Sequence, residues 1–434
     1  MKNTDNLIHV GTKKKVAFVC SGGASKAGAF HLGVALALQE QGFKFLGGLN
    51  KQKGSSGSNE PEPLEISTYV GSSAGSIICS YLAAGYSLDN IFHSFLGKGR
   101  EPDHTADPSP RELPRLTYQK MFKLRTTSIT DQIGQLRKFH KLFAVLMDSN
   151  WDDFLHLDWL KLSGIFSTSG LEQYLREEVL ASNSFHDYVA DLFIVATQLN
   201  HSRKVVFGKH SFQPPPHDLT CQYDNDVAIS DACAASTALP VIFSPYPIKN
   251  RNGQLYHYID GEIRDTLSTH VATDNGADLV IASYTHQPYH MTQEIGSLTE
   301  QGLPAIVIQS IYLLIEQKIN NHIYHNETQR NAFEAVSSYC KKEGIPDRQR
   351  HEICAILEKE LHHRLSVDTI YIHPKPGDTQ LFFGEHFTLS PKKMTAIVKC
   401  GFRSAIDILR KYHFADRKPK QAMGTTLFRH SAPN

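Results

Sequence analysis

Ser73 is the residue whose neighbours best suit it to act as a nucleophile. It is the central residue of a G-x-S-x-G segment that begins at Gly71 and ends at Gly75. Residues 64–70 are rich in β-branched and aromatic types and predict a strand, whereas residues 76–84 are mostly small or apolar and predict a helix. A strand-to-helix turn this tight strains the backbone of the serine and lifts its hydroxyl above the sheet. The competing interpretation is an ordinary turn built of small residues.

A second turn of this kind follows a predicted buried strand at residues 15–20. Its glycine-rich loop, residues 21–28, leads into a predicted helix at residues 29–41. The loop lacks the register of a dinucleotide-binding fingerprint, and it lacks the Lys and Ser/Thr that would follow its last glycine, Gly28, in a P-loop. A third interpretation is an oxyanion hole, in which the backbone amides of Gly22, Gly23 and Ala24 approach a developing alkoxide beside a helix N-terminus. Only this interpretation also accounts for Ser73.

Three motifs in this order resemble those of the patatin-like phospholipases. The first is the glycine-rich loop, in which Lys26 stands where the family usually has arginine, followed by the helix segment His31-Leu32-Gly33-Val34. The second is the G-x-S-x-G segment. The third is the stretch 235–245, which resembles the family pattern A-S-x-A-x-P-x-x-F-x-P. The resemblance implies a three-layer α/β/α fold with a mainly parallel central sheet, a helical insertion and a helical C-terminal part.

The resemblance also supplies a second catalytic residue, Asp260. The family uses a Ser-Asp dyad without histidine, and its aspartate opens a D-G-[G/A] motif that Asp260 and Gly261 match here. Glu262 replaces the small third residue of that motif. Its carboxylate either points away where the strand leads into the loop or, if it turns in, raises the pKa of Asp260. Lys26 is a candidate for binding a phospholipid head group, with a solvated lysine as the alternative.

The resemblance and the local composition together predict the domain boundaries. Residues 1–14 are expected to be a flexible N-terminus and residues 15–284 the catalytic domain, with a helical insertion at about residues 97–162 that could act as a lid. Residues 285–412 should add helices, a closing strand and a closing helix, and the basic end from residue 413 to 434 should be disordered.

Composition limits the remaining possibilities. The 434 residues are 41% hydrophobic with a net charge of +1, which favours a globular protein and argues against a nucleic-acid partner. No secretory signal or spanning segment is expected, so the predicted location is cytoplasmic or at the membrane periphery. The scattered cysteines suggest buried free thiols. No cofactor is expected; His322 and His325 could begin a metal site, but no third ligand has matching spacing and an exposed helix is favoured.

The predicted activity is that of a serine lipid acyl hydrolase acting on phospholipids or other lipid esters through an acyl-enzyme. Two alternatives remain open. One is an α/β-hydrolase with a Ser-Asp-His triad, in which His270 or His286 follows Asp260 in the chain. The other is a binding protein that uses the same fold without catalysis.

Overall fold

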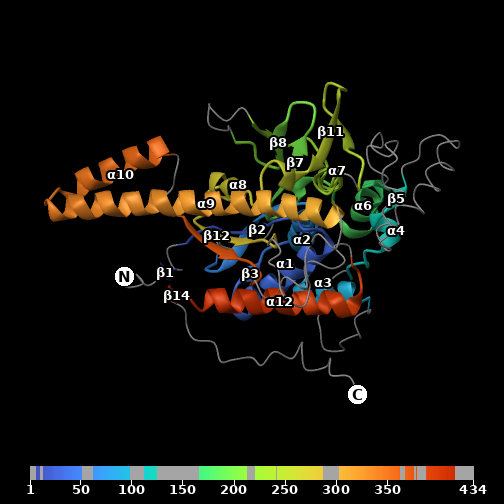
Figure 1. Cartoon of the computed structure of the whole chain (residues 1–434), viewed down its shortest axis with the longest axis horizontal. Helices are drawn as coiled ribbons and strands as arrows, with labels where there is room; N and C mark the ends of the chain where they lie inside the picture. Colours follow the sequence, from blue (N-terminus) through green and yellow to red (C-terminus); the bar gives the residue numbers. More distant parts are fainter. Residues whose placement is uncertain are drawn as a thin grey trace, which may run out of the picture.

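A central mixed sheet with helices on both faces organises the molecule (Figure 1). The computed structural model describes residues 6–9, 13–50, 62–97, 112–124, 166–212, 220–240, 242–286, 303–361, 367–375, 378 and 388–415. Helices flank the sheet above and below, so the predicted three-layer α/β/α fold is confirmed.

The middle of the sheet is parallel. Its main path runs β10 (Tyr246–Lys249), β11 (Leu255–Asp260), β7 (Asp191–Gln198), β4 (Glu65–Ser72), β2 (Val16–Cys20), β12 (Leu279–Ser283), β13 (Asp368–Ile372). From β7 to β13 every neighbouring pair on this path is parallel, while β10, β11 and β8 (Arg203–Gly208) add antiparallel pairings. The short strand β3 (Lys44–Phe45) pairs with β4, and β9 (Cys221–Asp224) pairs with β8. Because parallel strands share one direction, β2 and β4 deliver their following loops to the same edge.

Alternating burial along β2 explains the two helical layers. Val16, Phe18 and Cys20 point into one core, and Ala17 and Val19 point into the other. The first core is covered by α1 (Ala24–Glu40), α2 (Ala74–Ala83), α3 (Leu88–Leu96), α7 (Ile229–Ser236) and α12 (Pro391–Leu409). The second is covered by α8 (Thr269–Asp274) and the N-terminal half of α9 (Leu303–Lys342). Figure 1 shows α9 and α12 on opposite sides of the sheet.

Helix α12 packs unusually closely on α1. A Cβ added at Gly33 of α1 would lie 2.1 Å from the Val398 carbonyl oxygen, and one added at Gly401 of α12 would lie 2.2 Å from the Phe30 carbonyl oxygen. These glycines let the two helix backbones touch. The predicted closing helix is therefore present and is in contact with the helix that follows the glycine-rich loop.

Smaller elements connect these layers. They are α4 (Tyr118–Met121), β5 (Lys123–Leu124), β6 (Phe166–Ser167), α6 (Ser169–Tyr174), the π-helix η4 (Leu175–Val179) and the 3-10 turns η5 (Phe185–Asp187) and η6 (Gly261–Ile263). The predicted insertion and its lid function fall mostly outside the described residues, which include only residue 97 and residues 112–124 of that part of the chain.

The two ends of the chain are more ordered than predicted where they meet. Strand β1 (Asn6–His9) pairs in parallel with β14 (Tyr412–Ala415), although residues 1–14 were expected to be flexible and residues 413–434 disordered. Ile8 is 3% exposed, and the ring of Phe414 lies edge-on to that of Phe43 at 6.0 Å. Apolar contacts with the body thus order both segments.

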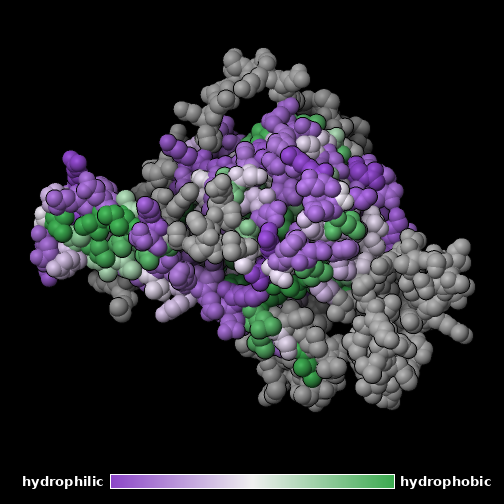
Figure 2. Space-filling view, turned by 90° about the horizontal axis from the view of Figure 1, so that it is seen from above, coloured by the Kyte–Doolittle hydropathy of each residue, from purple (hydrophilic) through white to green (hydrophobic). Residues whose placement is uncertain are grey.

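The helical C-terminal part was predicted correctly as helices, but it extends beyond the body. Helix α9 projects past the sheet and α10 (Asp347–Leu361) folds back along it (Figure 1). Apolar residues gather on this projecting end (Figure 2), where Ile356 is 61% exposed. None of the described helices is both long and apolar enough to cross a bilayer.

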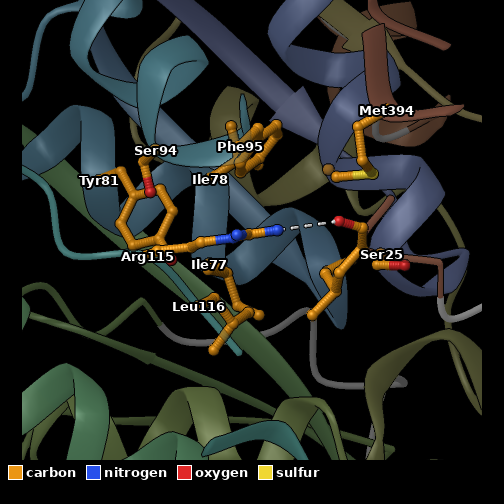
Figure 3. A pocket seen from close by; sticks show the side chains of 12 residues that line it. Ser25, Ile77, Ile78, Tyr81, Ser94, Phe95, Arg115, Leu116 and Met394 are labelled. Atoms are coloured by element: carbon orange, nitrogen blue, oxygen red, sulfur yellow. Dashed lines mark hydrogen bonds between the residues drawn. The ribbon is translucent and has the colours of Figure 1, made fainter. Parts of the chain in front are cut away.

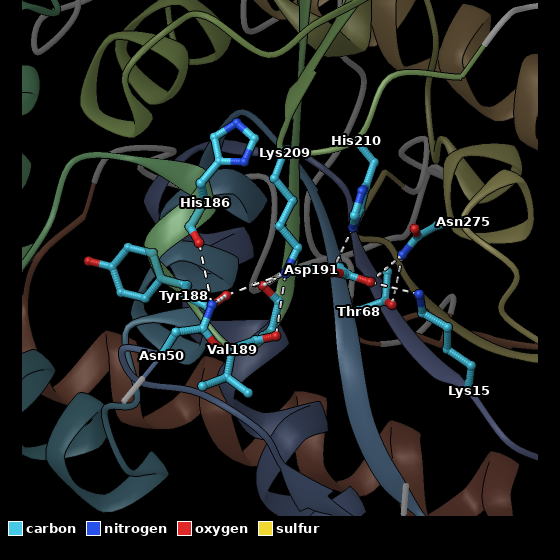
Figure 4. Close-up of polar contacts among 11 residues, drawn as sticks. Lys15, Asn50, Thr68, His186, Tyr188, Val189, Asp191, Lys209, His210 and Asn275 are labelled. Atoms are coloured by element: carbon cyan, nitrogen blue, oxygen red, sulfur yellow. Dashed lines mark hydrogen bonds and ion pairs between the residues drawn. The ribbon is translucent and has the colours of Figure 1, made fainter. Parts of the chain in front are cut away.

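Asp191 joins several strands at the end of the sheet where β7 begins (Figure 4). Its carboxylate accepts a hydrogen bond from Lys15 Nζ at 2.7 Å and one from Asn275 Nδ2 at 2.8 Å, and it lies 2.7 Å from Lys209 Nζ. Burial raises the pKa of Asp191, but these hydrogen bonds outweigh burial and hold it below its ordinary value. The cluster therefore stabilises the charged form.

Candidate active site

Ser73 lies in the sharp turn that the sequence predicted, between β4 and α2. Its φ of 51° and ψ of −127° are strained for a residue with a side chain, and it is 7% exposed. A Cβ added at Gly71 would lie 2.6 Å from the Gly75 carbonyl oxygen, and one added at Gly75 would lie 2.2 Å from the Cys20 carbonyl oxygen. The two glycines therefore allow the close approach of sheet and helix on which this turn depends.

Ser236, at the end of α7, holds the turn in place. Its hydroxyl accepts a hydrogen bond from the Ser73 backbone amide at 2.8 Å and donates one to the Val195 carbonyl at 2.6 Å. Sequence reasoning noted the motif around Ser236 without assigning this role. The serine in A-S-x-A-x-P was the available signal.

Strand register brings Asp260 to the level of Ser73. Strand β7 lies between β4 and β11, and it pairs Val195 with Ser72 on one side and Ala196 with Asp260 on the other. A Cβ added at Gly261 would lie 2.2 Å from the Val195 carbonyl oxygen, so this position accepts only glycine without movement of the backbone. The end of β11 therefore lies directly against the middle of β7.

The Asp260 carboxyl is buried and interacts with the Ser73 side chain. Burial raises its pKa to about 6, and the raise is opposed by the hydrogen-bonding interaction with Ser73 and by the Glu262 amide, which donates to Oδ1 at 3.0 Å. At neutral pH the side chain is therefore an ionised carboxylate of increased basicity, which suits a general base.

The glycine-rich loop turns into helix α1 earlier than predicted. Helix α1 begins at Ala24, so Lys26 and Gly28 are helical. Gly23 has a φ of 132° and Ala24 a φ of 60°, and this pair of left-handed residues redirects the chain from β2 into the helix. Within the described part of the chain, no hydrogen bond engages the amides of Gly23 and Ala24.

Gly22 differs from its two neighbours because its amide is already occupied. It donates a 2.7 Å hydrogen bond to Glu262 Oε1, which also accepts a hydrogen bond from the Ser72 hydroxyl. Glu262 is 4% exposed, and burial raises its pKa to about 8. The charge of Asp260 adds to this increase, while the hydrogen bonds from Ser72 and Gly22 oppose it. Glu262 thus turns into the site, the arrangement that the sequence left open.

His31 supports the loop from behind. Its Nε2 lies 2.8 Å from the Ser21 carbonyl oxygen and its Nδ1 lies 2.7 Å from the Ser283 hydroxyl. Since a carbonyl can only accept, Nε2 carries the proton and Nδ1 accepts from Ser283. Burial lowers the pKa of His31 to about 4, so the ring is neutral and has a structural role.

Lys26 lies in a different environment from the one predicted. The sequence suggested a loop lysine able to bind a head group, but the side chain is in the first turns of α1 and is 1% exposed. Its Nζ lies 5.6 Å from the centre of the Tyr312 ring on α9, and burial lowers its pKa to about 7. This burial contradicts the alternative of a solvated lysine.

The two histidines of the triad hypothesis have other neighbours. His270 Nε2 lies 2.9 Å from Lys204 Nζ, and its Nδ1 lies 3.7 Å from Asp265. His286 Nδ1 faces Glu262 Oε2 at 3.9 Å. Among the described residues, no histidine forms a hydrogen bond with Ser73 or Asp260.

An apolar pocket opens beside the nucleophile (Figure 3). It reaches Ala74, the residue after Ser73, and lies between α1, α2, α3 and α12. Its walls are mostly aliphatic and aromatic, and the guanidinium of Arg115 spans it and donates to the Leu389 carbonyl at 3.3 Å. The lining residues include Gly28, Ile77, Ile78, Tyr81, Phe95 and Met394. Such a pocket suits a hydrocarbon chain.

The two histidines on α9 have different surroundings. His322 Nε2 lies 2.9 Å from the Thr269 hydroxyl, and His325 is exposed. Across the described ranges, no three His, Cys, Asp or Glu side chains are grouped as a metal site requires.

Comparison with known families adds an independent result. The family model described as "Patatin-like phospholipase" matches residues 18–273, a span that contains Ser73, Asp260 and the glycine-rich loop. No curated protein matches the chain.

Proposed function

The chain belongs to the patatin-like phospholipase family, and from this premise we propose that it is a lipid acyl hydrolase whose catalytic groups are Ser73 and Asp260. The observation that carries the proposal is the interaction of the Asp260 carboxyl with the side chain of a serine held at a φ of 51° between strand and helix. Serine needs an adjacent base to become a nucleophile, and Asp260 is the base that interacts with it.

In the first half-reaction, Ser73 Oγ attacks the ester carbonyl carbon and its proton passes to Asp260. The carbonyl π electrons move to oxygen and give a tetrahedral oxyanion. When the intermediate collapses, the bond to the leaving alcohol breaks, Asp260 returns the proton to that alcohol, and an acyl-Ser73 ester remains. In the second half-reaction, Asp260 takes a proton from a water molecule as that water attacks the acyl carbonyl carbon. When the second tetrahedral intermediate collapses, the bond to Ser73 Oγ breaks and Asp260 returns the proton to Oγ, which releases the fatty acid and restores Ser73.

The amides of Gly23 and Ala24 are the donors we assign to the oxyanion. They lie at the N-terminus of α1, where the helix dipole favours negative charge, and have no hydrogen bond among the described residues. Losing one such donor lowers kcat by about two to three orders of magnitude in other hydrolases. Two donors would therefore supply a large part of the rate enhancement.

The pocket beside Ala74 supports a substrate with a hydrocarbon chain. We infer that this pocket receives the acyl group of the substrate, which would favour lipid esters over small polar esters.

Labelling with a fluorophosphonate tests the nucleophile directly. The wild-type protein should form one covalent adduct, located at Ser73, and should hydrolyse nitrophenyl esters and phospholipid vesicles. Ser73→Ala should remove the adduct, and both Ser73→Ala and Asp260→Asn should lower kcat by about a thousandfold or more. His270→Ala and His286→Ala serve as matched controls for the triad alternative, and activity lost only in one of them would favour a triad.

The remaining alternative is a binding protein on this fold. The occupied Gly22 amide is the observation in its favour. Absence of any adduct, together with unhydrolysed short and long esters, would overturn the proposal and favour that alternative.

A further inference from the structure

Glu262 connects the three segments from which the site is built. It follows Asp260 by two residues, its Oε1 accepts from the Gly22 amide at 2.7 Å, and the same oxygen accepts from the Ser72 hydroxyl. A Cβ added at Gly22 would lie 2.7 Å from both Glu262 Cγ and Ser73 Cβ. The carboxyl therefore fixes the spacing between the glycine-rich loop, the nucleophile turn and the base.

The second oxygen of this carboxyl indicates its protonation state. Glu262 Oε2 is buried and has no hydrogen-bond partner among the described residues. The buried atom facing it, His286 Nδ1 at 3.9 Å, also lacks a partner there. A carboxylate would leave a buried Oε2 without any donor, whereas a protonated Oε2 carries its own hydrogen and faces the neutral His286 ring.

We propose that Glu262 is a positioning residue that works as a neutral acid, so that its ionisation switches the hydrolase off. The inference rests on the proposed function, because the groups it positions are those assigned to catalysis there. The chain carries the Glu262 carboxyl at the position where the family motif has a small residue. The site is therefore active only while this carboxyl is protonated.

The groups around Glu262 determine what its ionisation would do. The carboxyl of Asp260 and, beyond it, that of Asp265 raise the pKa of Glu262 through their negative charge. His286 is neutral, because burial and the charge of Lys26 lower its pKa to about 3. Other charged or titratable groups in the surrounding elements include Lys26, Tyr312 and His31 near His286, Lys204 and His270 beside Asp265, Arg264 two residues after Glu262, and Lys318, which donates to the Ile263 carbonyl at 3.0 Å.

Ionised Glu262 would place a second negative charge beside Asp260 and beside the oxyanion that forms on the glycine-rich loop. Both effects oppose catalysis, because the transition state concentrates negative charge in the same place. Neutral Glu262 keeps its hydrogen bonds to Gly22 and Ser72 without that repulsion. The active form thus has Asp260 ionised and Glu262 protonated.

The pH profile of kcat/KM for a nitrophenyl ester tests this arrangement. In the wild type, activity should rise as Asp260 ionises near pH 6, then fall by about tenfold per pH unit above pH 8 as Glu262 ionises. Glu262→Gln keeps an acceptor oxygen for Gly22 and Ser72 but cannot ionise, so it should keep the acid limb and lose the alkaline limb. Glu262→Ala removes the link altogether, and kcat should fall by about ten- to a hundredfold with KM changed less than about threefold.

Two further variants control for misfolding and for nonspecific effects of the substitution. Ser72→Ala removes a donor that favours the ionised form, so the alkaline limb should move to higher pH even if Glu262→Gln does not fold. Glu352→Gln makes the same chemical change on the projecting helix α10, paired there with Arg348, and should leave the alkaline limb in place.

The outcomes separate this inference from the proposed function. If the wild type forms a Ser73 adduct and hydrolyses esters but its alkaline limb persists in Glu262→Gln, or stays unmoved in Ser72→Ala, another group such as Lys26 is titrating and the inference is wrong. If the wild type forms no adduct and hydrolyses no ester, the proposed function itself fails.

Discussion

Replacing Asp260 by asparagine should stabilise the folded protein while removing its activity. Asp260 is 2% exposed, and burial raises the pKa of its carboxyl from 3.8 to about 6. This rise of about two pH units corresponds to about 3 kcal/mol, the free energy by which folding disfavours the ionised form. Asparagine removes the charge and keeps an oxygen that can accept from the Glu262 amide.

The sign of the pH dependence follows from the raised pKa. Below pH 3.8 the carboxyl is protonated in both the folded and the unfolded state, so the aspartate has no electrostatic cost. The cost grows as pH rises towards 6 and is constant above it. The free energy of unfolding of Asp260→Asn should therefore exceed that of the wild type by up to about 3 kcal/mol near pH 7, and the difference should almost vanish near pH 4.

Urea denaturation followed by circular dichroism at these two pH values measures the difference. Ser73→Ala is the matched control, because it is equally inactive in the proposed mechanism but leaves the buried carboxylate in place. It should show no comparable gain in the free energy of unfolding. A gain for Asp260→Asn that is the same at both pH values, or no gain near pH 7, would refute the reasoning.

Three other predictions follow from packing and charge. Asp191→Asn leaves Lys15 and Lys209 without their carboxylate and should lower the free energy of unfolding by about 3 kcal/mol near pH 7. Because the pKa of Asp191 is lowered in the folded protein, this difference should shrink as pH falls below about 4. A loss of stability that is independent of pH would contradict the prediction. Gly261→Ala places a Cβ against the Val195 carbonyl and should move Asp260. We expect esterase kcat to fall by about a hundredfold while circular dichroism shows a folded protein. A kcat equal to that of the wild type would argue against the packing role of Gly261. Ile78→Trp fills the pocket beside Ala74 and should reduce kcat/KM for long-chain esters by about tenfold more than for short-chain esters, with an equal reduction for both excluding an acyl-binding role.

The features that sequence reasoning predicted best are local. The G-x-S-x-G turn, its flanking strand and helix, and the closing elements near residues 368–409 each depend on a short pattern of small, β-branched or apolar residues. The left-handed pair Gly23 and Ala24 made the start of α1 harder to place, because a glycine-rich stretch predicts a loop until the helix beyond it is known. The apolar contacts that order residues 6–9 and 412–415 could not be predicted either, because they form only after distant segments have come together in the fold.

Contacts among distant segments could not be predicted in this way. Glu262 meets Gly22 across 240 positions in the chain and Ser72 across 190, so no spacing rule connects them. Lys26 follows the glycines of an apparently exposed loop, and only the packing of α9 through Tyr312 shows that it is buried. The pKa values of Glu262 and Lys26 therefore depend on residues from other helices and strands.

The interlocked backbones of α1 and α12 have a consequence for how far the protein can be trimmed. Helix α12 lies outside the span 18–273 that the family model matches. A fragment cut down to that span would carry both residues of the proposed dyad, Ser73 and Asp260, yet lack the helix against which α1 packs. Such a fragment should therefore be inert, although it contains the whole matched domain.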